Sequence, residues 1–363
     1  MKKQGIFEPK ALQNLLSEHK DFKAVAVGTG AFMLKDFKGV QETTLEANPN
    51  YWEKGADGKA LPYIDGVRSL VFPDQVGVIA ALRTGQIDHT GAFGLTKRDA
   101  DQMRQSNPGL RYYPQFVLSF QGLWFNLKKK PFDNQKVRQA VSLALNREDV
   151  FASLGGPDAA IYASFVPPFL TDFAWPQDKA KQKYRQDLDA AKKLMAESGV
   201  APGDLTGLTM RTAGQYQQEA EAVQKQLQAI GIQPKMEIDS VTFSAILQKG
   251  DFDLGWGAYS GGPFANFWVG DFIRSDSNQN FIKLNDSRVD QLAIAQGKEL
   301  DLAKRKQIID QLHDRLYESM PYAPMATNFY HHFMACKVKN AMLANPTYNT
   351  PIALQAWIDP TGC

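Results

Sequence analysis

Cysteine is almost absent from this chain: Cys336 and Cys363 are the only two among 363 residues. They stand far from any Cys-x-x-Cys spacing, so the sequence contains neither a cysteine metal cluster nor a redox pair. An oxidising compartment would allow a disulfide between them, and the sequence leaves that pairing open. Their scarcity fits a large protein whose stability depends on its core rather than on covalent cross-links.

Long apolar runs are also missing. No run approaches the roughly 18 residues that a membrane-spanning helix needs. Met1-Lys2-Lys3 is basic, but the apolar stretch of about 7 to 15 residues that would make a signal peptide does not follow it. We therefore expect no membrane span and no signal peptide within this sequence.

Catalytic motifs are absent as well. Gly28-x-Gly30 lacks a third glycine, because position 33 is Met33, so it does not make a dinucleotide-binding loop. Asp251-x-Asp253 begins like a calcium loop, but its twelfth position is Gly262, which cannot ligate as a glutamate would. No Gly-x-Ser-x-Gly elbow occurs. The sequence therefore predicts no catalytic residue and no cofactor.

A paired histidine, His331-His332, is the one feature that could attract a metal ion. Adjacent residues of a strand point to opposite faces, so these two side chains would not chelate together. We expect no metal site.

Strong charge of either sign is lacking. The net charge is +2, with 22% charged and 44% hydrophobic residues, as in an ordinary soluble globular protein. A nucleic-acid-binding protein would usually carry a basic face, so we expect no nucleic-acid partner. The length exceeds that of one ordinary core and favours two lobes.

The most informative segment that is present spans residues 121–149. An apolar strand, residues 122–127, leads to a turn at Pro131, and Asp133 or Asn134 then caps a helix. The apolar positions of this helix follow the i, i+3, i+4, i+7 spacing of one buried face. Asn146 ends that face and can cap a second helix.

This strand–turn–helix corner closely resembles one in the family 5 extracellular solute-binding proteins, the dipeptide and oligopeptide receptors of ABC importers. Further segments are similar to family signatures and occur in the family's order: residues 28–32, 45–52, 61–67, 80–88, 230–232 and 249–254. Each motif alone is weak, whereas six in the right order, over nearly the whole chain, are specific.

The resemblance implies an α/β, two-lobed periplasmic-binding-protein-like fold of the class II type. It implies a partial large lobe over residues 1–125, a second α/β lobe over residues 126–325 and a return segment over residues 326–363. The hinge crossings would lie near Asn126 and Ala326. It also implies that the N-terminal part of the large lobe and a small subdomain are missing, because only 27 residues precede the 28–32 motif.

By the same resemblance, the chain is the substrate-binding component of an ABC importer. It would capture a small solute, a peptide or an oligosaccharide, between two lobes and deliver it to the permease subunits. Such a receptor is a monomer in the periplasm or outside the cell, and is membrane-associated in some hosts. The alternative reading is an α/β hydrolase acting on oligosaccharides or peptides, in which paired carboxylates could lie unrecognised.

The second half of the chain shows its own pattern, independent of the resemblance. Strands expected at 208–212, 232–239 and 252–257 alternate with helices at 215–230 and 241–249. This β-α-β-α-β order predicts a mostly parallel sheet covered by helices.

Aromatic residues and glycines are concentrated in the loop after the last of these strands. Ligands of open α/β sheets bind beyond the carboxyl ends of strands, and aromatic rings make apolar walls for a ligand. In the resembled family, the same loop lines the ligand cleft. The predicted ligand-binding residues are Trp256, Gly257, Ala258, Tyr259, Ser260, Phe264, Asn266 and Trp268. Packing within the core is the alternative role for each of these rings.

One absence in this loop bears on the ligand. The family's peptide receptors offer an aspartate here to the ligand's free amino group, but residues 257–263 contain no carboxylate. Asp271 lies further along and could replace it or be a surface residue. We therefore expect a ligand without an obligatory free amino terminus, such as an oligosaccharide or a blocked peptide.

Overall fold

The computed structural model describes residues 28–362, apart from residues 40, 73, 92–93, 117, 154, 157–158, 240–241, 263, 346–349 and 353–354. The described chain forms two compact units. Unit 1 contains the residues up to Leu95, Asp99–Gln115 and the residues from His331, and unit 2 contains Thr96–Arg98 and Phe116–Tyr330. Cys363 lies outside the described residues, so the possible disulfide between Cys336 and Cys363 is outside them as well.

Unit 1 contains a three-stranded antiparallel sheet in the order β1-β2-β3. Its elements are β1 (Phe32–Phe37), β2 (Glu42–Ala47), β3 (Gly66–Leu70), α2 (Gln75–Arg83), α3 (Lys97–Ser106), β4 (Leu110–Phe116), β11 (Val338–Lys339), β12 (Met342–Asn345), β13 (Thr350–Ile352) and β14 (Trp357–Ile358). The first two residues of α3 and the last residue of β4 belong to unit 2. Its hydrophobic cluster is small and consists of Leu82, Leu95, Ala100, Met103 and Phe333.

Unit 2 holds the larger core. Its strands are β5 (Ser119–Phe125), β6 (Ala160–Tyr162), β7 (Thr209–Thr212), β8 (Lys235–Ile238) and β9 (Leu254–Ser260). Its α-helices are α4 (Gln135–Ala144), α5 (Arg147–Ser153), α6 (Gln177–Lys183), α7 (Leu188–Ser198), α8 (Gln217–Leu227), α9 (Phe243–Lys249), α10 (Ser287–Lys298) and α11 (Leu302–Ser319). The long strand β10 (Tyr322–Ala335) begins in unit 2 and continues into unit 1.

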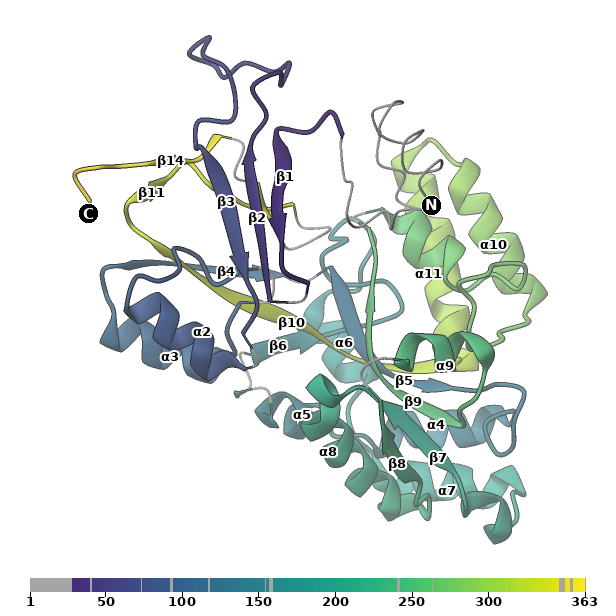
Figure 1. The fold of residues 1–363 in the computed structure, drawn as a ribbon. Coiled ribbons are helices and arrows are strands. Elements are labelled where there is room, and N and C mark those ends of the chain that lie inside the picture. Colours follow the sequence, from purple (N-terminus) through teal and green to yellow (C-terminus); the bar gives the residue numbers. More distant parts are fainter. Residues whose placement is uncertain are drawn as a thin grey trace, which may run out of the picture. The chain divides into compact units, whose positions relative to one another are not determined.

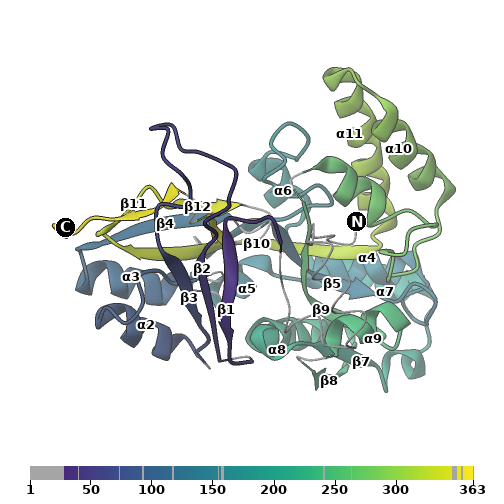
Figure 2. The ribbon, with the colours of Figure 1, turned by 45° about the horizontal axis from the view of Figure 1, so that its top comes forward.

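The helices of unit 2 follow the pattern that their sequences predict. α4 and α7 pack on one another, and α10 and α11 lie side by side in both ribbon views (Figures 1 and 2). α11 has Ile309, Leu312 and Leu316 on its buried side. Within the part of the chain that the structure describes, no helix combines the length and apolar character needed to cross a membrane.

The main sheet is mixed rather than mostly parallel. Its order is β4-β10-β5-β9-β7-β8, with β6 beside β10. β7 pairs with β8 and β9 in parallel, as the β-α-β-α-β pattern predicts. β5 pairs antiparallel with both β9 and β10, which makes the sheet mixed. The strands at 209–260 belong to a different sheet from β1, β2 and β3.

The corner at residues 121–149 forms as predicted. The Asn134 side chain accepts a hydrogen bond from the Lys136 N–H at 2.9 Å and caps α4. The apolar face of α4 is buried. Asn146 Oδ1 accepts from the backbone N–H groups of Glu148 and Asp149 at 3.1 and 3.3 Å, so it caps α5.

Both predicted hinge residues, Asn126 and Ala326, belong to unit 2. The chain passes between the two units at Leu95–Thr96, Arg98–Asp99, Gln115–Phe116 and Tyr330–His331. Asn126 is buried in unit 2, and Ala326 pairs with Gln121 in the sheet of unit 2. β5 and β10 pair with each other beside these residues, and the hinge role of Asn126 and Ala326 stays a prediction.

Candidate functional site

Strand β9 carries most of the predicted binding residues, and its register with β5 separates them onto two faces. Gln121 pairs with Ala258 and Leu123 pairs with Trp256, whereas Phe120 pairs with Tyr259. Because side chains alternate along a strand, Trp256, Ala258 and Ser260 share one face of the sheet, and Gly257 and Tyr259 share the other.

The face that carries Tyr259 is an aromatic cluster, here called the aromatic face. Its rings pack at centroid distances of 4.2 to 6.3 Å and belong to Phe120, Trp124, Tyr259, Phe267, Trp268, Phe272 and Phe281. Gly257 is required here, because a Cβ at this position would lie 2.9 Å from the ring of Phe243. The aromatic face therefore forms a dense part of the unit 2 core.

Polar atoms of the aromatic face already have partners. The Tyr259 hydroxyl donates to Gln279 Oε1 at 2.9 Å, and Trp268 Nε1 donates to the Gly262 carbonyl at 2.8 Å. Burial raises the pKa of the Tyr259 phenol, and the nearby Asp271 raises it further. Asp271 is exposed. These contacts favour a packing role for Tyr259 and Trp268.

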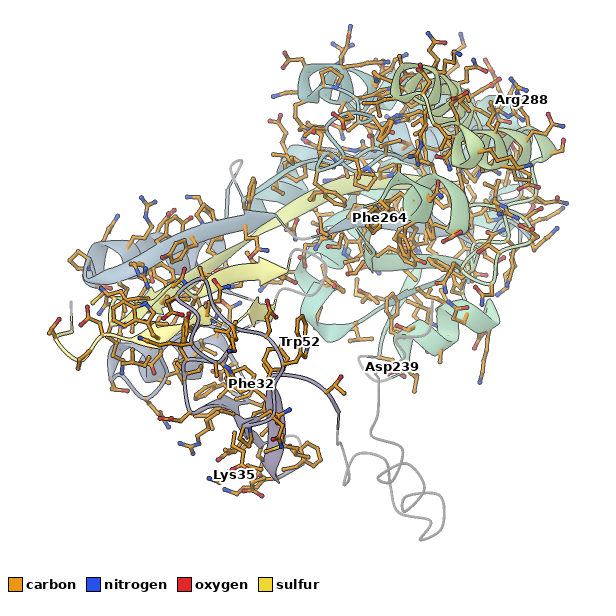
Figure 3. The ribbon with its side chains drawn as sticks, turned by 90° about the horizontal axis from the view of Figure 1, so that it is seen from above. Phe32, Lys35, Trp52, Asp239, Phe264 and Arg288 are labelled. Atoms are coloured by element: carbon orange, nitrogen blue, oxygen red, sulfur yellow. The ribbon has the colours of Figure 1, made fainter. Side chains whose placement is uncertain are left out.

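Phe264 and Asn266 line a surface pocket of about 400 Å³ with residues 169–173 and Arg305. Phe264, labelled in Figure 3, is 72% exposed. Asn266 Oδ1 accepts hydrogen bonds from Gln296 Nε2 at 2.8 Å and from Arg305 at 3.1 Å. The amide of Asn266 therefore holds α10 and α11 at the pocket edge.

The opposite face of the sheet is polar at the same end of β9, and we call it the polar face. Ser119 pairs with Ser260, and Thr212 of β7 pairs with Trp256. The polar face consists of Ser119, Gln121, Thr212, Trp256, Ala258 and Ser260. It lies at the carboxyl ends of β7 and β9, the edge at which α/β sheets bind ligands.

Three side chains with polar atoms are buried on this side of the sheet. Gln121 is 3% exposed, Glu219 of α8 is 5% exposed and Trp256 is fully buried. Gln121 Nε2 donates to Glu219 Oε1 at 3.5 Å, a long hydrogen bond. Within the described residues, Gln121 Oε1 and Trp256 Nε1 have no partner. Buried polar groups are nearly always hydrogen-bonded, so these two atoms can each accept or donate one further hydrogen bond.

The fold explains how Glu219 reaches this position. It occupies the first turn of α8, where the helix N-terminus favours a negative charge. Burial raises the pKa of the Glu219 carboxyl, and the hydrogen bond from Gln121 lowers it in part. The carboxyl group is thus held in a poorly solvated place beside the amide of Gln121.

Sequence reasoning missed Gln121 and Glu219, although α8 contained a signal. Glu219 lies four residues before Val223 and eight before Leu227, which are both buried. A carboxylate in line with the apolar face of a helix must enter the core or a site. Gln121 had no comparable signal, because a glutamine within a strand is ordinary.

The side chains of His331 and His332 contact different rings, as expected for adjacent residues of a strand. The His331 ring stacks on Tyr112 with centroids 5.9 Å apart, and the His332 ring stacks on His89 at 5.5 Å. Over the described residues, no group of three or more His, Cys, Asp or Glu side chains could hold a metal ion.

Comparison with known sequences identifies relatives of the chain. The model of the bacterial extracellular solute-binding proteins, family 5 middle region, matches residues 9–281. The oligopeptide-binding protein AppA of Bacillus subtilis is 26% identical over 328 residues, which cover 85% of this chain and 58% of AppA. Di/tripeptide-binding protein 1 of Pseudomonas aeruginosa is 25% identical over 320 residues, covering 84% of this chain and 56% of the relative.

Solved structures show the same fold. DppA of Helicobacter pylori, in complex with the peptide STSA, superposes with a TM-score of 0.80 at 21% identity, covering 98% of this chain and 68% of DppA. AppA of Bacillus subtilis, in complex with a nonapeptide, gives a TM-score of 0.78 at 24% identity and covers 97% of this chain and 72% of AppA. The predicted α/β, periplasmic-binding-protein-like fold is therefore confirmed.

The chain spans a little more than half the length of the curated relatives that it matches. The family match covers most of the chain, in agreement with the motifs that suggested it. The chain belongs to the bacterial extracellular solute-binding proteins of family 5.

Proposed function

We propose that the chain binds a small peptide-type solute for an ABC importer and delivers it to the permease subunits of that importer. The observation that carries the proposal is the polar face, where Gln121, Glu219 and Trp256 present buried polar atoms at the carboxyl end of β9. The relatives support the class of solute, because several are named for oligopeptides, dipeptides or tripeptides.

In this proposed role the protein is a monomer in the periplasm or outside the cell, with membrane attachment in some hosts. It acts without catalysis, since a receptor needs only a higher affinity for the solute in one of its states. Enclosure of the solute by two lobes, with crossings near Asn126 and Ala326, stays a prediction. The pocket beside Phe264 is a second candidate surface for the solute. The polar face is favoured because Gln121 Oε1 and Trp256 Nε1 are buried there and have no partner in the part of the chain that the structure describes.

Calorimetric titration with a panel of peptides from two to nine residues, with maltotriose and maltopentaose as oligosaccharides, tests the proposal. We expect saturable binding of one or more peptides and recovery of the bound peptide unchanged, as mass spectrometry would show. Cleavage of the peptide would instead favour the hydrolase alternative. Binding of the oligosaccharides alone would contradict the peptide class.

Two variants locate the site on one face of β9. Trp256→Phe removes the Nε1 donor of the polar face and keeps an aromatic ring, whereas Tyr259→Phe removes the hydroxyl of the aromatic face. We expect weaker peptide binding only for Trp256→Phe, after circular dichroism has shown that both variants are folded. Loss of binding in Tyr259→Phe alone would place the site on the aromatic face.

A further inference from the structure

The carboxyl group of Glu219 is buried in unit 2. Among the described residues, no cationic side chain contributes to its environment, and it accepts hydrogen bonds from the Gln121 amide and its own backbone. Carboxylates that are buried in proteins are usually paired with a cation. The N-terminus of α8 compensates only part of one charge, so the carboxyl group can still accept hydrogen bonds from a positively charged group.

Gln121 adds a second acceptor to the same place. Its Nε2 group is turned toward Glu219, which leaves Oε1 buried and without a partner in the described part of the chain. Glu219 and Gln121 together offer acceptor oxygens from α8 and β5. A primary ammonium group has three donors and no acceptor, and it is complementary to such a pair.

Trp256 supplies the opposite kind of group. Its Nε1 is a donor, is buried and has no partner within the described residues. Trp256 pairs with Leu123 of β5. Leu123 lies two residues from Gln121, and residues two apart in a strand share a face, so Trp256 and Gln121 lie on the same face of the sheet. A carbonyl oxygen of a bound solute is complementary to this donor.

We propose that Glu219, together with Gln121, is the subsite that receives an ammonium group of the solute. This inference rests on the proposed peptide-binding function and names the residues that select the ligand. It differs from the expectation drawn from residues 257–263, because the carboxylate comes from α8 rather than from the loop after β9. The ammonium group can come from a peptide N-terminus or from a lysine side chain.

Calorimetry with three matched tripeptides tests the subsite: Ala-Ala-Ala, N-acetyl-Ala-Ala-Ala and N-acetyl-Ala-Lys-Ala. A hydrogen-bonded charge pair changes affinity by about tenfold to a hundredfold. We expect wild-type protein to bind an ammonium-bearing peptide more tightly than N-acetyl-Ala-Ala-Ala by that factor. The free tripeptide and the lysine peptide identify which source of the ammonium group is used.

Glu219→Gln should remove this preference, because it keeps the side-chain shape and an acceptor for Gln121 but loses the charge. Glu219→Met is a second variant, with similar volume and no polar group. The control is Glu221→Gln, which changes the same charge on the exposed side of α8, where Glu221 accepts from Gln217. The control should retain the wild-type preference.

The outcomes separate the two proposals. Equal binding of all three peptides by wild-type protein, or a preference that persists in a folded Glu219→Gln variant, would overturn the ammonium subsite and leave the peptide receptor intact. In that case Glu219 and Gln121 hold only buried water. Failure of every peptide to bind wild-type protein would contradict the receptor function itself, and the subsite with it.

Discussion

The imidazole of His313 lies flat against the indole of Trp175, with ring centroids 3.7 Å apart and planes 7° from parallel. His313 is fully buried, and within the described residues neither of its ring nitrogens has a hydrogen-bond partner. Burial lowers the pKa of His313 well below its ordinary value, and the charges of Lys179 and Lys306 lower it further. A neutral ring is therefore part of the native packing of unit 2.

This neutral ring predicts acid sensitivity. The unfolded chain binds a proton at His313 below pH 6.5, its ordinary pKa, whereas the folded chain does not. The free energy of unfolding should therefore fall as the pH drops below that value, by up to about 1.4 kcal/mol per pH unit for this residue. Urea denaturation at pH 7.5 and pH 5 should show a smaller loss for His313→Leu than for wild type. The same loss in both proteins would contradict the assignment.

Adjacent glycines after β9 should respond oppositely to alanine. A Cβ at Gly261 would overlap the ring of Phe267, which stacks on Tyr259, whereas a Cβ at Gly262 would meet its nearest atom at 3.8 Å. Gly261→Ala should destabilise the protein by about 1–3 kcal/mol, the range for overpacking. Gly262→Ala should be neutral or stabilising by up to about 1 kcal/mol. Thermal denaturation compares them, and equal effects would rule out the steric cause.

Local sequence signals were sufficient to predict much of unit 2. The caps Asn134 and Asn146, the buried face of α4, and the strands and helices between residues 208 and 257 all follow from hydrophobic period and capping chemistry. These signals depend on neighbours in the sequence. They do not report which distant strands pair, so the antiparallel pairing of β5 with β9 and β10 could not be predicted.

The candidate site was predicted less well, for a related reason. Trp256 and Tyr259 are three residues apart in one strand, and both looked like ligand-binding rings. Their odd spacing in one strand places them on opposite faces, and only the register with β5 shows that Trp256 shares its face with Gln121. Glu219 comes from a separate helix, so its approach to that face depends on the packing of α8. Contacts between distant segments of the chain therefore determine the candidate site.

Asn126, predicted as a hinge residue, should prove essential to the stability of unit 2. Its Nδ2 group donates to the carbonyl groups of Gly250 and Phe252, both at 3.0 Å, and its Oδ1 accepts from the Lys128 N–H at 3.2 Å. Asn126→Ala leaves these buried or half-buried groups without partners, so we expect a loss of about 2–4 kcal/mol. Asn126→Asp should lose more at neutral pH, because a carboxylate would face two carbonyl oxygens.

Urea denaturation of both Asn126 variants measures this loss. Gln279→Ala serves as a comparison, because its side chain accepts a single hydrogen bond from the hydroxyl of Tyr259, and we expect a smaller effect. Full stability of Asn126→Ala together with altered solute affinity would support a hinge role instead.

Hydrogen exchange should separate β5 from β2, although both are central strands. β5 lies between β9 and β10, and β2 lies between β1 and β3, so each has hydrogen-bonding neighbours on both sides. They differ in burial, since every residue of β5 is buried and every residue of β2 is only half-buried. Protection against exchange follows the apolar contacts that must be broken on opening, in addition to the hydrogen bonds themselves.

We therefore expect the amides of β5 to exchange only with global unfolding of unit 2, and those of β2 to exchange through local opening at a lower free energy. Exchange monitored by mass spectrometry, with and without a low concentration of urea, distinguishes the two, because only global opening is strongly accelerated by denaturant. Equal protection of β2 and β5 would mean that backbone pairing alone controls exchange in this protein.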